Sequence, residues 1–344
     1  MSLKLKPWQQ LALGLAISLI FVYLLYREID LEAWRQSLRD ADYRYLAPVL
    51  AVMVFGWYLR GLRWRILLSP LITISPWRCF SIVSVAALIN VLVPARAGEV
   101  WRAHRLGRDL GLSRSTAFGT IIVERLLDGL VVAFLGLIVL LTVTTSGVIA
   151  VLVGLSALGF ATAALALGVL AHSSRLRRRL AAVSIRLLPR RHRAFVEEKL
   201  SLLLVGLQTV RSRSSLALAA AVTVMINVFD AVAFYLVGEA FGFDVALHNY
   251  LLIVVVANLA TAVPVSIAGV GPVEFFVVRG LRLMGVGSSA AAAYAAVVHG
   301  LITVVILTLG VAFAWRMGLN VRSIFKRPAA EAGTPESAGA TGQT

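Results

Sequence analysis

Residues 90–99 read NVLVPARAGE, and residues 258–274 read NLATAVPVSIAGVGPVE. Each stretch is an apolar run that carries an Asn, meets a Pro and continues through an Ala-Gly step to a Glu. Because Pro removes a backbone donor and Gly relaxes the chain, we expect neither stretch to run as an unbroken helix. In hydrocarbon, freed backbone groups are tolerated only where protein or a polar cavity receives them. Two matching interruptions, one in each half of a chain, are typical of transporters with a binding site near the middle of the membrane.

The composition is that of an all-α integral membrane protein. Of 344 residues, 59% are hydrophobic and 15% charged, and the mean hydropathy is +0.87. Apolar runs long enough to cross about 30 Å of hydrocarbon recur along the chain. The runs lie near 8–26, 45–62, 116–142, 148–171, 215–240 and 287–315, with shorter broken ones near 79–95 and 250–265. The first run ends without a small-residue cleavage site, so we interpret it as a retained helix rather than a secretory signal.

Charge and cysteine content exclude several classes of function. The net charge is +16, which in a membrane protein reflects basic cytoplasmic loops that meet anionic lipid headgroups. Nucleic-acid binding is therefore not expected. The single Cys79 precludes an intrachain disulfide and a multi-cysteine metal site. The sequence has no P-loop, HExxH motif or recognisable Ser/His/Asp pattern, so we expect neither an enzyme nor a bound cofactor or metal.

Loop charges constrain the topology. Segment 27–44 has four Arg and five acidic side chains, a net charge of −1. The net charge is +4 for 60–78, +3 for 96–114 and +9 for 172–214. If all eight runs crossed the membrane, 96–114 and 172–214 would both lie outside, against the positive-inside bias.

A re-entrant arrangement removes this conflict. If 79–95 enters from the cytoplasm and returns there, every basic segment falls inside, and the second broken run must return to the outer face. We therefore predict about six full transmembrane helices plus two inverted re-entrant helical hairpins. Eight complete transmembrane helices are the alternative. The preferred topology places both termini in the cytoplasm, and we expect the protein in a bacterial inner membrane.

The chain is expected to form one polytopic unit over residues 1–322. Within it, about 172–214 forms a basic cytoplasmic loop that includes an amphipathic helix on the inner surface, because Leu side chains recur there at helical spacing beside several Arg. Residues 323–344 are rich in Ala, Gly, Ser and Thr and are expected to be a disordered cytoplasmic tail.

Three charged residues interrupt the third long run. Glu124 and Asp128 are four residues apart and share a helix face, with Arg125 about 100° away. A charge deep in a bilayer costs roughly 3 kcal/mol or more, so such groups normally face a cavity and have partners. They either lock helices together or form a charged wall for a polar headgroup.

The corners of the two broken stretches carry further candidates. Arg96 and Glu99 lie at the first corner, and Gly269, Gly271 and Glu274 lie at the second. Free N–H groups at a helix N-terminus, together with a guanidinium, suit a phosphate or carboxylate. The alternative is that each Glu only caps its helix and complements the positive helix end.

Four other polar residues within apolar runs are secondary candidates. They are Asn90, Asp230, Asn258 and His299. Each is more often an interhelical hydrogen-bond partner than a ligand contact. Asp230 is the most suspect, because an unpaired carboxylate in mid-helix needs a cation or a proton.

The motifs VPARAGE (93–99), ERLLD (124–128) and PVSIAGVGPVE (264–274), in this order, give the chain a family resemblance. It resembles the flippase-like transmembrane domain of lysylphosphatidylglycerol synthase over about residues 8–318, as a stand-alone member without the aminoacyl-transferase domain. The resemblance implies a helical bundle with two re-entrant hairpins that moves or presents a lipid with a polar headgroup. The residues that match the family motifs are Arg96, Glu99, Glu124, Arg125, Asp128 and Glu274.

These observations predict a lipid translocase that takes an anionic or zwitterionic headgroup into a polar cavity between the hairpins. Arg96 and the helix N-termini would take the phosphate, and Glu124, Asp128 and Glu274 would take a cationic part or couple protons. The alternative is an accessory protein that binds a phospholipid or polyisoprenyl-linked lipid for a membrane transferase. A membrane-embedded enzyme with Mg²⁺ at Glu124 and Asp128 is a third possibility. The oligomeric state is left open.

Overall fold

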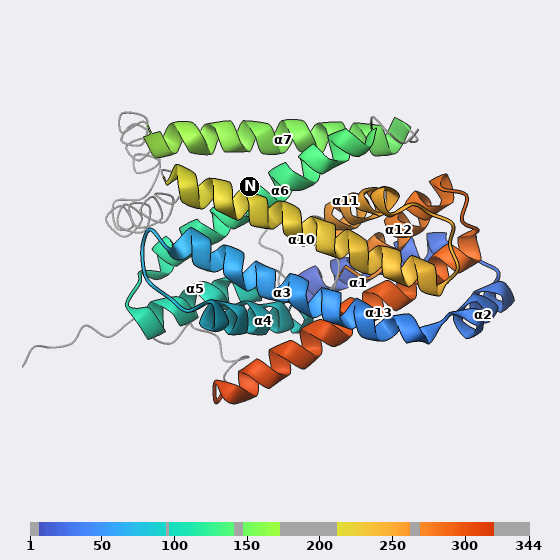
Figure 1. The fold of residues 1–344 in the computed structure, drawn as a ribbon, viewed down its shortest axis with the longest axis horizontal. Coiled ribbons are helices and arrows are strands. Elements are labelled where there is room, and N and C mark those ends of the chain that lie inside the picture. Colours follow the sequence, from blue (N-terminus) through green and yellow to red (C-terminus); the bar gives the residue numbers. More distant parts are fainter. Residues whose placement is uncertain (1–6, 94–95, 141–146, 173–211, 262–268, 320–344) are drawn as a thin grey trace, which may run out of the picture.

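The computed structural model describes residues 7–93, 96–140, 147–172, 212–261 and 269–319. Within these ranges the ordered elements are all helical, as the composition predicts. Among the described residues, six long helices form the frame of the molecule, and Figure 1 shows their arrangement. They are α1 (Pro7–Tyr26), α3 (Leu46–Leu68), α6 (Arg114–Leu140), α7 (Gly147–His172), α10 (Arg213–Ala240) and α13 (Ser288–Arg316). These six helices match the six long apolar runs of the sequence.

By length and composition, three of the described spans can cross a membrane unaided. They are Tyr43–Leu68, Arg213–Ala240 and Ser288–Arg316. Helix α6 has 27 residues and is also long enough, but it carries Glu124, Arg125 and Asp128 near its middle. The frame is therefore that of a polytopic membrane protein whose central helix has a charged segment.

The first broken stretch forms a helical hairpin of α4 (Pro76–Leu92) and α5 (Ala97–Leu110). Between the two helices, Arg96 adopts the left-handed conformation with φ of 52°. The two arms cross closely at Gly98, where a Cβ would lie 1.9 Å from the backbone oxygen of Ala86. Asn90 fixes this crossing, because its Oδ1 accepts the Gly98 N–H at 2.8 Å.

The open end of the first hairpin is closed by an ion pair. Arg78 Nη2, near the start of α4, lies 3.2 Å from Asp109 Oδ2, near the end of α5. The two arms therefore begin and end at the same side of the bundle. With 17 and 14 residues, they rise about 26 and 21 Å, less than the ~30 Å of a hydrocarbon core.

The return arm differs from the sequence prediction. We expected 79–95 to return within itself and 96–114 to be a cytoplasmic segment, but residues 97–110 of that segment form α5. The arm is polar enough to resemble a loop in sequence. It is stable as a helix because buried Arg102 pairs with Glu124 of α6.

The second broken stretch forms a hairpin of α11 (Tyr250–Thr261) and α12 (Pro272–Leu283). Each arm has 12 residues and rises only about 18 Å. The arms pack closely where Gly280 faces Ile253, since a Cβ on the glycine would lie 2.7 Å from Cδ1 of the isoleucine. Near the corner, Gly271 packs against α1, and a Cβ there would lie 2.7 Å from the backbone oxygen of Ser18.

The two hairpins enter the bundle from opposite ends. Helices α3 and α10 pack along each other, and Ser69 Oγ after α3 lies 3.5 Å from Ser215 Oγ at the start of α10. At the other end, the Asp42 N–H donates to the Ala240 oxygen at 2.8 Å. The chain enters the first hairpin from the Ser69 end and the second from the Ala240 end, so Figure 1 shows them in opposite halves. The predicted pair of inverted hairpins is confirmed as an arrangement of helices.

Residues 27–44, the segment with a net charge of −1, contain the short helix α2 (Leu31–Asp40). Asp30 caps it, because its Oδ1 accepts the N–H groups of Glu32 and Ala33 at 2.8 and 3.2 Å. The helix packs against α13. The predicted basic loop at 172–214 and tail at 323–344 lie almost entirely outside the described residues, and so stay predictions.

Candidate functional site

Helix α6 places two carboxylates inside the bundle, as their spacing predicts. Glu124 lies ten residues into the helix, about 15 Å from its start, and Asp128 lies one turn further. The Glu124 residue is only 2% exposed. Because an isolated buried carboxylate is very costly, its partners decide what this region can do.

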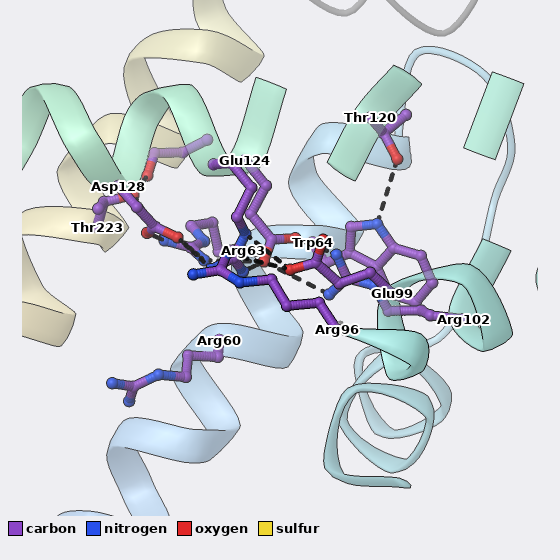
Figure 2. A network of polar contacts seen from close by, with 12 residues as sticks. Arg60, Arg63, Trp64, Arg96, Glu99, Arg102, Thr120, Glu124, Asp128 and Thr223 are labelled. Carbon is purple, nitrogen blue, oxygen red and sulfur yellow. Dashed lines mark hydrogen bonds and ion pairs between the residues drawn. The ribbon is translucent and has the colours of Figure 1, made fainter. Parts of the chain in front are cut away.

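Glu124 pairs with three guanidinium groups, and Figure 2 shows it within a network of polar contacts that includes Arg63 and Arg102. Its Oε1 lies 3.0 Å from Arg63 Nη2 of α3 and 2.6 Å from Arg125 Nη2. Its Oε2 accepts from Arg102 Nη2 of α5 at 2.9 Å. One buried carboxylate thus joins α3, α5 and α6.

Asp128 extends this arrangement toward α10. It pairs with Arg63, and its Oδ2 lies 3.2 Å from Arg125 Nη1. Arg63 also donates through Nη1 to the hydroxyl of Thr223, a buried residue of α10, at 3.3 Å. The ion pairs therefore join three helices, and the hydrogen bond to Thr223 adds α10 as a fourth.

The corner of the first hairpin contributes one more pair. Arg96 Nη1 lies 3.7 Å from Glu99 Oε1, and Arg125 Nε lies 3.5 Å from the same oxygen. The corner is thereby tied to α6. We call the full set the charge cluster; it comprises Arg63, Arg96, Arg102, Arg125, Glu99, Glu124 and Asp128.

The charge cluster has a buried core and an exposed edge. The side chains of Arg63, Arg102 and Glu124 are only 3–4% exposed. At the edge, those of Arg96 and Arg125 are each 42% exposed. Counted over these seven described residues, four guanidiniums and three carboxylates give a net charge of +1. The exposed edge is therefore where a polar ligand can make contact.

Aromatic packing supports the buried core. The Arg102 guanidinium lies 4.5 Å from the ring centroid of Trp64, a cation–π contact. The Trp64 indole N–H in turn donates to Thr120 Oγ1 at 3.3 Å. Arg102 is thus held on one side by a ring and on the other by Glu124.

Sequence reasoning missed Arg63 and Arg102. Arg63 was counted in a loop because the apolar run ends near 62, but α3 continues to Leu68. Arg102 lies in the basic segment 96–114, which was counted as a cytoplasmic loop but contains α5. A signal for both was present: Glu124 and Asp128 outnumber Arg125 in their own helix, so at least one further cation had to come from another helix.

The second hairpin has a smaller polar site at its corner. Glu274 Oε2 accepts the Gly271 N–H at 2.7 Å, so the carboxylate caps α12. The other oxygen, Oε1, lies 2.7 Å from His299 Nδ1 of α13. Gly269 and Gly271 have φ of 83° and 94°, values that favour glycine. The Gly271 N–H, predicted to be available to a ligand, is used by this cap.

The remaining candidates form local contacts. Asp230 has the cation its position demands, because Arg60 Nη2 lies 2.7 Å from its Oδ2. Asn258 Nδ2 donates to the Val254 oxygen at 3.0 Å. The predicted residues thus divide between the charge cluster, the second corner and separate helix contacts. The predicted cavity between the corners involves 94–95 and 262–268, which lie outside the described residues.

Among the described side chains, no group of three or more His, Cys, Asp or Glu could hold a metal ion. Glu124 and Asp128, which the sequence offers as possible Mg²⁺ ligands, are paired with guanidiniums. The fold and this site define a class of protein: a polytopic helical membrane protein with two inverted hairpins and an internal charge cluster.

The chain matches the family described as "Lysylphosphatidylglycerol synthase TM region" over residues 11–310. It therefore belongs to that family, as the three motifs predicted. The family match includes the charge cluster and both hairpins.

Two relatives show how this region occurs in other proteins. A "UPF0104 membrane protein" of Methanothermobacter thermautotrophicus is 27% identical over 303 residues, which cover 83% of this chain and 89% of that protein. "Glycosyltransferase AglD" of Haloferax volcanii is 28% identical over 135 residues, 39% of this chain but only 22% of that protein. No solved structure matches the chain.

Proposed function

We propose that this protein is a non-enzymatic lipid translocase of a bacterial inner membrane. A phosphate-bearing headgroup enters the bundle at the charge cluster while the lipid tails stay in the bilayer. Family membership supports this proposal at the level of a membrane protein with this fold. The chemistry of the charge cluster supports a lipid headgroup as its ligand.

The excess positive charge of the charge cluster carries the proposal. Charged residues inside a membrane protein are costly, and they typically mark substrate pathways. A lipid phosphate would supply the balancing negative charge. Guanidinium groups suit it, because they donate paired hydrogen bonds to phosphate oxygens.

The exposed edge is the part that meets the headgroup. Arg96 and Arg125 are the most exposed members of the charge cluster, and Arg96 lies at the hairpin corner in a left-handed conformation. Such backbone strain in a non-glycine residue is concentrated at functional sites. Arg63, Arg102 and Glu124 instead form a buried support that holds the edge in place.

The buried support also has more donors than acceptors. Arg63 Nε and Arg102 Nε are buried and have no hydrogen-bond partner. Unsatisfied buried donors are rare in folded proteins. Both nitrogens are buried, so they do not contact a headgroup themselves, and binding falls to the exposed edge.

Glu274 and His299 provide a second polar contact, at the other hairpin. Both side chains are half-buried, and the two face each other between α12 and α13. We propose that this pair takes a cationic part of the headgroup or a coupled proton. With both termini cytoplasmic, the basic loops would face the anionic inner leaflet.

The proposal is tested by headgroup scrambling of fluorescent phosphatidylglycerol in proteoliposomes. The Arg96→Gln/Arg125→Gln variant removes two edge cations but leaves Glu124 its buried partners Arg63 and Arg102. We expect scrambling to fall at least about tenfold, since each charged hydrogen bond contributes about 1.5–3 kcal/mol. The control is Arg44→Gln, which removes an ion-paired, 90% exposed Arg far from the charge cluster. Wild-type protein that scrambles no faster than empty vesicles would overturn the proposal.

A second function has one observation in its favour. The match to part of a protein named as a glycosyltransferase suggests that this fold can accompany a transferase. In that case the protein binds a phospholipid or a polyisoprenyl-linked lipid for a membrane transferase without moving it. This function predicts a stable complex with a transferase and no flux in proteoliposomes, whereas the translocase is active alone.

A further inference from the structure

We propose that Arg60 of α3 forms a second phosphate-binding station, one helical turn from the charge cluster, with Asp230 of α10 as its positioning residue. This inference rests on the proposed translocase function. It assigns the headgroup a path along the α3–α10 contact, where neither the family motifs nor the charge cluster places a binding residue.

Arg60 lies on the face of α3 that packs into the protein. Positions 49, 53, 56, 60, 63 and 67 follow one helical stripe. All of them except Arg60 are buried, from Val49 near one end of the stripe to Leu67 at the other. The Arg60 side chain is 26% exposed in the middle of this stripe. An accessible cation therefore interrupts an otherwise buried contact surface.

Asp230 interrupts the matching stripe of α10 in the same way. Thr223, Asn227, Phe234 and Val237 lie on the same face of that helix and are all buried. The Asp230 side chain is 23% exposed. The buried stripes of α3 and α10 are thus interrupted at the same point, where an ion pair takes the place of buried side chains.

The local geometry leaves Arg60 able to bind an anion. It donates one hydrogen bond, from Nη2 to Asp230 Oδ2 at 2.7 Å, and its guanidinium lies 5.0 Å from the ring centroid of Trp57. A guanidinium has five N–H donors in a planar fork. Asp230 and Trp57 fix the orientation of the fork, and the other donors suit the oxygens of a phosphate.

The station is continuous with the charge cluster. Arg63 follows Arg60 by three residues, a rise of about 4.5 Å, and Figure 2 shows the two side chains on neighbouring turns of α3. On α10, Thr223 bonds Arg63 and Asp230 bonds Arg60, two turns apart. In this proposal, a phosphate that leaves Arg125 or Arg96 next meets Arg60, the cation one turn away on α3.

The test is scrambling of fluorescent phosphatidylglycerol by the Arg60→Gln/Asp230→Asn variant. The amide pair can keep a hydrogen bond between α3 and α10 while it removes both charges. We expect about tenfold slower scrambling with an unchanged thermal unfolding temperature. The matched control is Asp42→Asn/Arg44→Gln, which neutralises another Arg–Asp pair, in the segment before α3, and should scramble as the wild type does.

Scrambling within twofold of the wild type would overturn the station while leaving the translocase function intact; a wild type without activity would overturn the function itself. If the double variant does not fold, scrambling by the Arg60→Lys variant distinguishes a structural pair from a phosphate-binding station. A lysine keeps the ion pair with Asp230, so a purely structural pair predicts full activity. The station predicts at least about threefold slower scrambling, because an ammonium paired with Asp230 lacks the fork.

Discussion

Arg102 Nη2 lies 2.9 Å from Glu124 Oε2, and this buried ion pair joins the return arm of the first hairpin to the central helix α6. Among the described residues, Glu124 is the only carboxylate that pairs with Arg102. Arg63, by contrast, has both Glu124 and Asp128. The two carboxylates of α6 therefore differ in their partners, although they lie one helical turn apart on the same face of the helix.

This difference predicts unequal effects on stability. Glu124→Gln leaves Arg102 buried without a counter-charge, and breaking a buried pair on one side costs about 3–5 kcal/mol. Asp128→Asn should cost less, on the order of 1 kcal/mol, because Asp128 is 29% exposed and Arg63 keeps Glu124. Thermal unfolding of the purified variants in detergent measures both. Equal destabilisation by the two variants would contradict the different roles assigned here.

The close crossing inside the first hairpin gives a second prediction. In Gly98→Ala the new methyl group would lie 1.9 Å from the Ala86 oxygen, so the arms must separate. We expect a loss of about 1–3 kcal/mol or more, together with loss of scrambling, because the corner that carries Arg96 moves with α5. Unfolding temperature and scrambling rate are the measurements.

Gly300→Ala is the control for this variant. Gly300 is also helical, but a Cβ there meets nothing within 4 Å, so Ala should be neutral or slightly stabilising. If Gly98→Ala behaved as this control does, the hairpin arms would not be in contact at the crossing.

Charge and helix breaks made most of this architecture predictable. The Pro and Gly breaks in 90–99 and 258–274, together with the basic segments, predicted two inverted hairpins, because buried backbone and positive charge follow strict rules in a membrane. The same rules did not predict α5 and α2 as helices, because their polar sequences resemble loops. Their helical state depends on tertiary contacts, such as that between Arg102 and Glu124, which a single sequence does not display.

The charge cluster was predictable only in part. The acidic residues were recognised because a carboxylate in an apolar run is conspicuous. Arg60 and Arg63 were not, because they lie at the end of the apolar run near 45–62, and Arg side chains at such ends normally extend to the interface. The structure turns them inward, since α10 supplies Thr223 and Asp230 as partners.

The inverted hairpins predict a sidedness that labelling can check. Cys79, the only cysteine, is buried and can be replaced by Ala. Single cysteines are then placed as Thr73→Cys, before the first hairpin, and Gly287→Cys, after the second; both positions are exposed. We expect a membrane-impermeant maleimide to label the first only from the cytoplasm and the second only from outside. Labelling of both from one side would exclude opposite insertion.

The last prediction concerns the corner of the second hairpin, where Glu274 has two distinct contacts. Its cap on the Gly271 N–H requires only an acceptor oxygen, whereas its contact with His299 involves charge. Glu274→Gln should therefore keep the cap and lose the charge, while Glu274→Ala loses both. We expect Ala to cost about 1 kcal/mol more than Gln in unfolding free energy, the usual contribution of an N-terminal cap. If the pair serves translocation, both variants should slow scrambling equally despite this difference in stability. Full activity of Glu274→Gln would limit Glu274 to capping α12.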